Sequence, residues 1–123
     1  MNIRKVCLLC LLMLVANPVL AASAAVREMA GILVKLEHYP NAAEKSRLKD
    51  IAASKDTTAQ EKVVANAMLN LKHTAADADK VKLKQVMEDS TVPTEVHELA
   101  EIILGLNHVP SAADKQMLQQ MMK

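Results

Sequence analysis

The chain has 123 residues, which corresponds to one small domain, since domains usually contain about 100–200 residues. Hydrophobic residues make up 51% of the chain and aromatic residues 1%, so any core must consist of aliphatic side chains and methionine. Two glycines and four prolines are too few for a turn-rich β-sandwich, and a net charge of +1 excludes a strongly basic nucleic-acid binder. This composition favours an all-α protein, because alanine, leucine, lysine and methionine are strong helix formers.

Residues 1–21 have the three-part pattern of a secretory signal peptide. Arg4 and Lys5 precede an apolar run over residues 6–15, and small residues follow around Ala21. The sequence therefore predicts export, to the periplasm or out of the cell. An uncleaved membrane anchor is the alternative, but the run is shorter than the ~20 residues of a typical spanning helix.

We expect cleavage after Ala21, with a second candidate position after Ala24, leaving a single domain over residues 22–123. Cys7 and Cys10 have a spacing that is typical of redox or metal sites, but they lie in the apolar run and would be removed with it. Processing would also change the net charge from +1 to −1. We therefore expect no nucleic-acid partner and no stable membrane insertion after cleavage.

The mature chain repeats itself at a period of 35 residues, in copies of about 26–58, 59–93 and 94–123. Six columns are identical in the three copies: Ala30, Ala65 and Ala100; Leu36, Leu71 and Leu106; His38, His73 and His108; Ala43, Ala78 and Ala113; Lys45, Lys80 and Lys115; Leu48, Leu83 and Leu118. Because a pair of short helices cannot bury its apolar face alone, such copies are expected to share a continuous core.

Each copy is predicted to form a helical hairpin. The first helices are expected over 26–38, 59–73 and 94–108, and the second over 42–53, 77–88 and 112–122. The first helices have a wide apolar face, as expected for an inner layer, and the second have a narrow one, as expected for an outer layer. Short connections predict antiparallel neighbours. Six short antiparallel helices result, arranged as a solenoid-like stack or as a compact bundle.

Helix starts are marked by a capping residue three positions before an acid, at Asn41 and Glu44, Thr58 and Glu61, and Ser111 and Asp114. The second copy has Ala76 where the other two have Asn41 and Ser111. Thr74 or Asp77 would have to cap that helix, and its turn could be shifted.

The repeated His38, His73 and His108 are candidate metal ligands, because imidazole is the commonest protein ligand for metals. Three nitrogens bound to one zinc ion lie only a few ångströms apart, whereas stacked helices are about 8–10 Å apart at each step. In a stack we therefore expect the three side chains to stay well apart, each interacting with the last carbonyls of its helix. A closed bundle would weaken this geometric argument.

Met117, Met121 and Met122 are candidate thioether ligands for Cu(I), but their spacing matches that of the leucines and indicates core packing. No pattern of a catalytic site occurs, so neither an enzyme nor a cofactor is predicted. The function that the repeats favour is an adaptor or scaffold that binds another protein or a peptide. The alternative is a periplasmic copper- or zinc-binding protein that uses the histidines or methionines.

Overall fold

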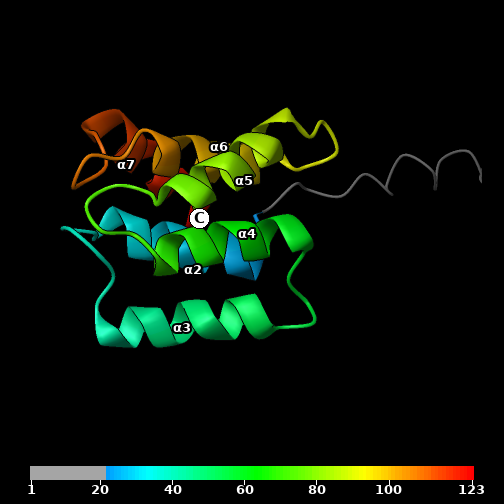
Figure 1. Cartoon of the computed structure of the whole chain (residues 1–123), viewed down its shortest axis with the longest axis horizontal. Coiled ribbons are helices and arrows are strands. Elements are labelled where there is room, and N and C mark those ends of the chain that lie inside the picture. Colours follow the sequence, from blue (N-terminus) through cyan, green and yellow to red (C-terminus); the bar gives the residue numbers. More distant parts are fainter. Residues whose placement is uncertain (1–21) are drawn as a thin grey trace, which may run out of the picture.

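A computed structural model describes residues 22–123, which form six α-helices and no β-strand (Figure 1). The predicted signal peptide lies outside the described residues. The helices are α2 (Ala24–Val34), α3 (Ala42–Ala53), α4 (Ala59–Leu69), α5 (Asp77–Glu88), α6 (Thr94–Leu104) and α7 (Ala112–Met121). The all-α prediction is confirmed. Within the described part of the chain, no helix combines the length and the apolar character that a bilayer crossing requires.

The three longer predicted helices end four residues earlier than expected. They stop at Val34, Leu69 and Leu104, so that each repeated histidine lies in the turn that follows. The buried leucine two residues before each histidine still continues the apolar spacing of its helix, as Leu36 does after Leu33. Periodicity alone therefore predicts inner helices that are too long at their C-terminal ends.

The predicted capping boxes are present at the starts of α3, α4 and α7. In α3, for example, the Asn41 side chain accepts a hydrogen bond from the Glu44 N–H at 2.8 Å. The expectation for α5 is wrong: neither Thr74 nor Asp77 caps it, and it begins after Ala76 without a side-chain cap, in the same register as the other copies. Acidic side chains in its first turn offset the exposed N–H groups there.

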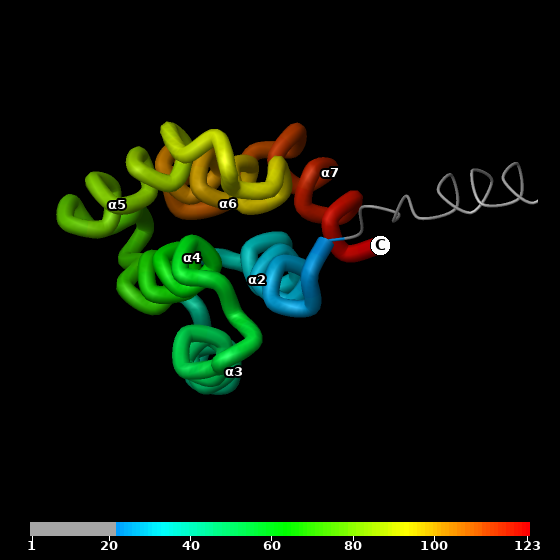
Figure 2. Tube along the Cα trace, turned by 90° about the vertical axis from the view of Figure 1, so that its right-hand side faces the viewer, coloured from blue at the N-terminus to red at the C-terminus, as the bar shows by residue number. Residues whose placement is uncertain are grey.

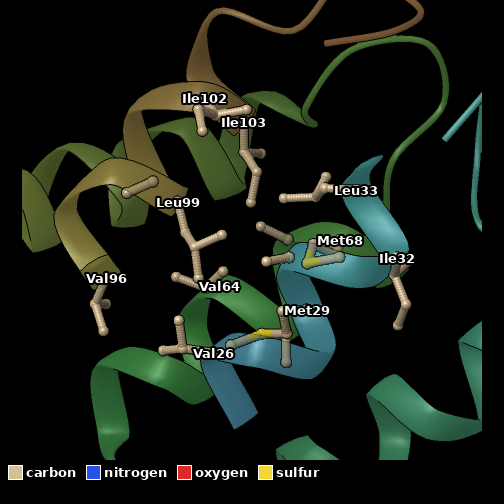
Figure 3. Close-up of a cluster of buried hydrophobic side chains, with 14 of the residues drawn as sticks. Val26, Met29, Ile32, Leu33, Val64, Met68, Val96, Leu99, Ile102 and Ile103 are labelled. Carbon is tan, nitrogen blue, oxygen red and sulfur yellow. The ribbon is translucent and has the colours of Figure 1, made fainter. Parts of the chain in front are cut away.

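The helices form an inner and an outer layer. Figure 2 shows α2, α4 and α6 at the centre, with α3, α5 and α7 around them. The inner helices supply most of the buried side chains, which meet in one aliphatic core (Figure 3); those labelled there are Val26, Met29, Ile32, Leu33, Val64, Met68, Val96, Leu99, Ile102 and Ile103. The wide apolar faces of the inner helices are thus covered from several sides.

Each outer helix packs mainly against the inner helix of the next copy, although α5 also packs on α4, the inner helix of its own copy. Helix α3 packs on α4, α5 packs on α6, and α7 packs on α2, while the contacts between α2 and α3 and between α6 and α7 are slight. Since the last helix packs on the first, the six helices close into a ring. In an open solenoid the first and last helices would be apart, so the compact bundle is the arrangement observed.

Closure of this ring predicts that three leucines spaced 35 residues apart contribute equally to the stability of the protein. Leu48, Leu83 and Leu118 are each 0% exposed. We expect Leu118→Ala to lower the free energy of unfolding by about 2–5 kcal/mol, as for Leu48→Ala and Leu83→Ala, because each change leaves a cavity in a closed core. Urea denaturation followed by circular dichroism would measure this. Met122→Ala, at an exposed position of the same end, is the control. A negligible effect of Leu118→Ala alone would contradict closure.

The segment before α2 is tied to α4 through one buried carboxylate. Ser23 is the N-cap of α2 and accepts a hydrogen bond from the Val26 N–H, and its hydroxyl donates to Glu61 at 2.5 Å. Glu61 is only 5% exposed and also accepts from the Thr58 N–H. Of the two predicted cleavage positions, only the one after Ala21 retains Ser23.

Removing the Ser23 hydroxyl should therefore lower the free energy of unfolding more than removing a capping side chain that makes no other contact. We expect Ser23→Ala to lower the free energy of unfolding by about 2–4 kcal/mol, because the helix loses its cap and a buried carboxylate loses a donor. Ser111→Ala, which removes an exposed cap only, should cost about 1 kcal/mol. Chemical denaturation of both variants checks this, and equal losses would show that the link to Glu61 contributes nothing.

Candidate metal site

Three equivalent turns present the repeated histidines at one end of the bundle. The connections that follow α2, α4 and α6 lie together at the left-hand end of Figure 1. In each turn the residues two before and two after the histidine are buried: Leu36 and Pro40, Leu71 and Ala75, Leu106 and Pro110. The histidine between them is exposed. Each turn is therefore held to the core on both sides, with its imidazole directed away from the core.

The backbones of the three turns are also linked to one another. The His73 N–H donates to the His38 carbonyl at 3.0 Å, and the His108 N–H donates to the His73 carbonyl at 2.8 Å. His73 and His108 have positive φ angles of 66° and 72°, in the left-handed region. This conformation is uncommon for residues other than glycine, although histidine adopts it more readily than most. Two of the three histidines thus have a backbone conformation that is unfavourable for a residue with a side chain.

The three imidazoles converge. Their ring centroids lie 4.9 Å apart for His38 and His73, 5.6 Å for His38 and His108, and 4.6 Å for His73 and His108. One nitrogen from each ring lies within 4.8 Å of the other two. The expectation that these side chains stay well apart is wrong. It assumed a linear stack, in which equivalent turns are displaced step by step, whereas ring closure arranges them around a common axis.

A neighbouring amide orients one of the rings. His108 Nδ1 lies 2.8 Å from Asn107 Oδ1, an oxygen that can only accept a hydrogen bond. Nδ1 then carries the proton, and Nε2 has the free lone pair that a metal ion needs. Hydrogen bonds of this kind commonly fix the tautomer of histidine ligands.

The interpretation of these histidines as helix caps is also wrong. The C-cap residues are Lys35, Asn70 and Gly105, and their own N–H groups bond to the last helix carbonyls. Within residues 22–123, no ring of the triad hydrogen-bonds a helix carbonyl. The sequence pattern placed the histidines correctly at equivalent positions, but it extended the helices to them.

The fourth histidine has a different environment. His97 Nε2 lies 2.7 Å from the carbonyl oxygen of Asp89, in the connection between α5 and α6. The Asp89 carboxylate accepts hydrogen bonds from the hydroxyl and the N–H of Thr91, which together lower the pKa of Asp89. His97 thus stabilises a turn and lies outside the triad.

The candidate thioether ligands lie on α7 or just after it. Met121 is 5% exposed and belongs to the core, and Met117 packs against that core. Met122 is 42% exposed and its methyl group lies over Gly31 of α2. These positions are those of packing residues, and a thioether copper site stays a prediction.

Comparison of the chain with protein-family models, with curated proteins and with solved structures finds no match.

The positive φ angles predict which of two substitutions, glycine or alanine, gives the more stable protein at each histidine position. At positions 73 and 108, glycine should give a more stable protein than alanine by about 1 kcal/mol, because alanine is strained in the left-handed region. At position 38, where φ is not positive, alanine should be the more stable by about 0.5–1 kcal/mol. Thermal unfolding of the six single variants measures both differences. The same order at all three positions would contradict this backbone geometry.

Proposed function

We propose that the protein binds a divalent transition-metal ion, zinc or copper(II), through the imidazoles of His38, His73 and His108. The convergence of these three rings from turns 35 residues apart carries the proposal. Zinc–nitrogen bonds of about 2.0–2.1 Å place three ligand nitrogens about 3.3 Å apart. Because all three side chains are exposed, small rotations can close the remaining gap from 4.8 Å.

The donor set indicates the class of metal. Imidazole nitrogens suit zinc, copper, nickel and iron, whereas magnesium and calcium prefer oxygen ligands. Three protein ligands leave at least one coordination position open to water or to another ligand. An exposed triad also lets the ion enter and leave without unfolding of the bundle, which favours reversible binding over a permanent structural role.

We also propose that the three 35-residue segments are tandem copies of one two-helix unit. The starts of α2, α4 and α6, at residues 24, 59 and 94, support this, as do the equivalent turns that carry the triad. A threefold arrangement of one unit supplies the same side chain three times around an axis. A histidine at a single position of the unit is then sufficient to build a complete ligand set.

Export is part of this proposal, on the basis of the predicted signal peptide, and we place the metal site in the periplasm or outside the cell. The adaptor function predicted from the repeats is the second candidate. It is favoured by exposed apolar side chains beside the triad in sequence, namely Tyr39 and Val109, which are 57% and 44% exposed. A protein partner at this end would contact them. We propose no catalytic activity.

Metal binding predicts a stabilisation that depends on the triad. A ligand that binds only the folded state adds about 2.7 kcal/mol at a hundredfold excess over its Kd. Zn²⁺ or Cu²⁺ should therefore raise the melting temperature of the wild type by several degrees. The variant with His38→Gln, His73→Gln and His108→Gln should show no such rise.

His97→Gln is the matched control, because it removes a histidine outside the triad. Its melting temperature without metal should fall, since the contact with Asp89 is lost, but the increment caused by metal should remain. The proposed site would be refuted if metal raised the melting temperature of the triple variant as well, or did not raise that of the wild type.

A further inference from the structure

A cavity lies directly beside the triad, where the first copy meets the second. Its volume is about 350 Å³, and small-molecule sites commonly have about 300–1,000 Å³. It is lined by Tyr39, Lys45, Leu69, Leu71, Lys72 and His73. Since His73 belongs both to this lining and to the triad, a molecule in the cavity would lie next to an ion held by the three imidazoles.

The lining combines positive charge with an apolar wall. It contains two ammonium groups and no carboxylate. Within the described residues neither Lys45 nor Lys72 forms an ion pair with an acid. Lys45 Nζ lies 5.5 Å from the centre of the Tyr39 ring, and Leu71 is 1% exposed. The cavity thus offers two uncompensated cations at its polar side, together with an aromatic ring and aliphatic side chains.

This combination occurs at only one of the three equivalent positions in the described bundle. Lys45 has counterparts in the other copies, Lys80 and Lys115, but Tyr39 and Lys72 do not. The positions equivalent to Tyr39 are Thr74 and Val109, and those equivalent to Lys72 are Glu37 and Asn107. Repetition of one unit therefore explains the triad, but it does not explain the second cation or the aromatic ring.

We propose that this cavity binds a small organic carboxylate with an apolar body. The carboxylate lies between the ammonium groups of Lys45 and Lys72, and the apolar body packs on Tyr39 and the leucines. One carboxylate oxygen can also occupy the coordination position that three imidazoles leave open on the metal. This last contact rests on the proposed function, whereas binding in the cavity does not.

Tyr39 makes the cavity directly observable, because it is the only tyrosine and the chain has no tryptophan or phenylalanine. The probe is 4-methylpentanoate, an aliphatic carboxylate that does not absorb where tyrosine is excited. Titration into the zinc-free protein should give a saturable change in tyrosine fluorescence. Acetate, which lacks the apolar body, and the neutral 4-methylpentanamide should each bind about tenfold more weakly, a difference of roughly 1.4 kcal/mol.

The double variant Lys45→Gln with Lys72→Gln should raise the Kd of 4-methylpentanoate about tenfold or more, because charge-assisted hydrogen bonds are lost. The matched control is Lys80→Gln with Lys115→Gln, which changes the counterparts of Lys45 and should leave the Kd unaltered. Absence of a saturable change, or equal affinity in the two double variants, would overturn the assignment of the cavity.

The effect of zinc on the affinity for 4-methylpentanoate tests whether the carboxylate contacts the metal ion. Saturating Zn²⁺ should lower the Kd of 4-methylpentanoate about tenfold, and this gain should vanish in His38→Gln with His108→Gln, which leaves the cavity lining unchanged. If zinc raises the melting temperature but leaves the Kd unaltered, the contact between carboxylate and metal is refuted. If zinc has no effect on the melting temperature, the proposed metal site fails, and the zinc-free titration still decides the cavity.

Discussion

The packing of α7 against α2 brings the two ends of the described chain together, and the convergence of His38, His73 and His108 depends on it. Each outer helix covers the inner helix of the following copy, so the third outer helix needs a partner and finds it in the first inner helix. Closure buries the wide apolar faces of α2, α4 and α6 against one another. The three turns that follow these helices lie at one end of the molecule, and closure arranges them around a common axis.

The proposed metal site combines one histidine from each 35-residue segment, and no segment contains it alone. A single copy provides one exposed histidine between two buried residues, and this turn has no evident chemistry of its own. Three copies around an axis place three imidazole nitrogens within 4.8 Å. The positive φ angles at His73 and His108 indicate that this arrangement has a backbone cost. A cluster of convergent, exposed imidazoles formed at such a cost supports the proposed metal binding over a purely structural role.

The departures from exact repetition are as informative as the repeat. Glu61 stands where the other copies have Val26 and Val96, and it links α4 to the N-cap of α2. Tyr39 and Lys72 likewise have no counterparts, and they make one of three equivalent junctions cationic and aromatic. The residues that recur in all three copies form the core and the triad. The residues that occur in one copy only make one side of the bundle different from the others.

The sequence by itself determined the helical class, the 35-residue period, the starts of five of the six described helices and the aliphatic core, because these depend on local spacing and on capping side chains such as Asn41 and Ser111. It missed the start of α2, which lies at Ala24 and not at residue 26. It did not determine the ends of the inner helices, since Leu36 continues the apolar pattern beyond Val34. Nor could it place His38, His73 and His108 relative to one another. The apolar pattern of the sequence is compatible with a stack and with a ring, and only the long-range packing of α7 on α2 decides between them. That contact joins residues far apart in the chain, and together with the hydrogen bonds between the turns it brings three equivalent histidines into one candidate site.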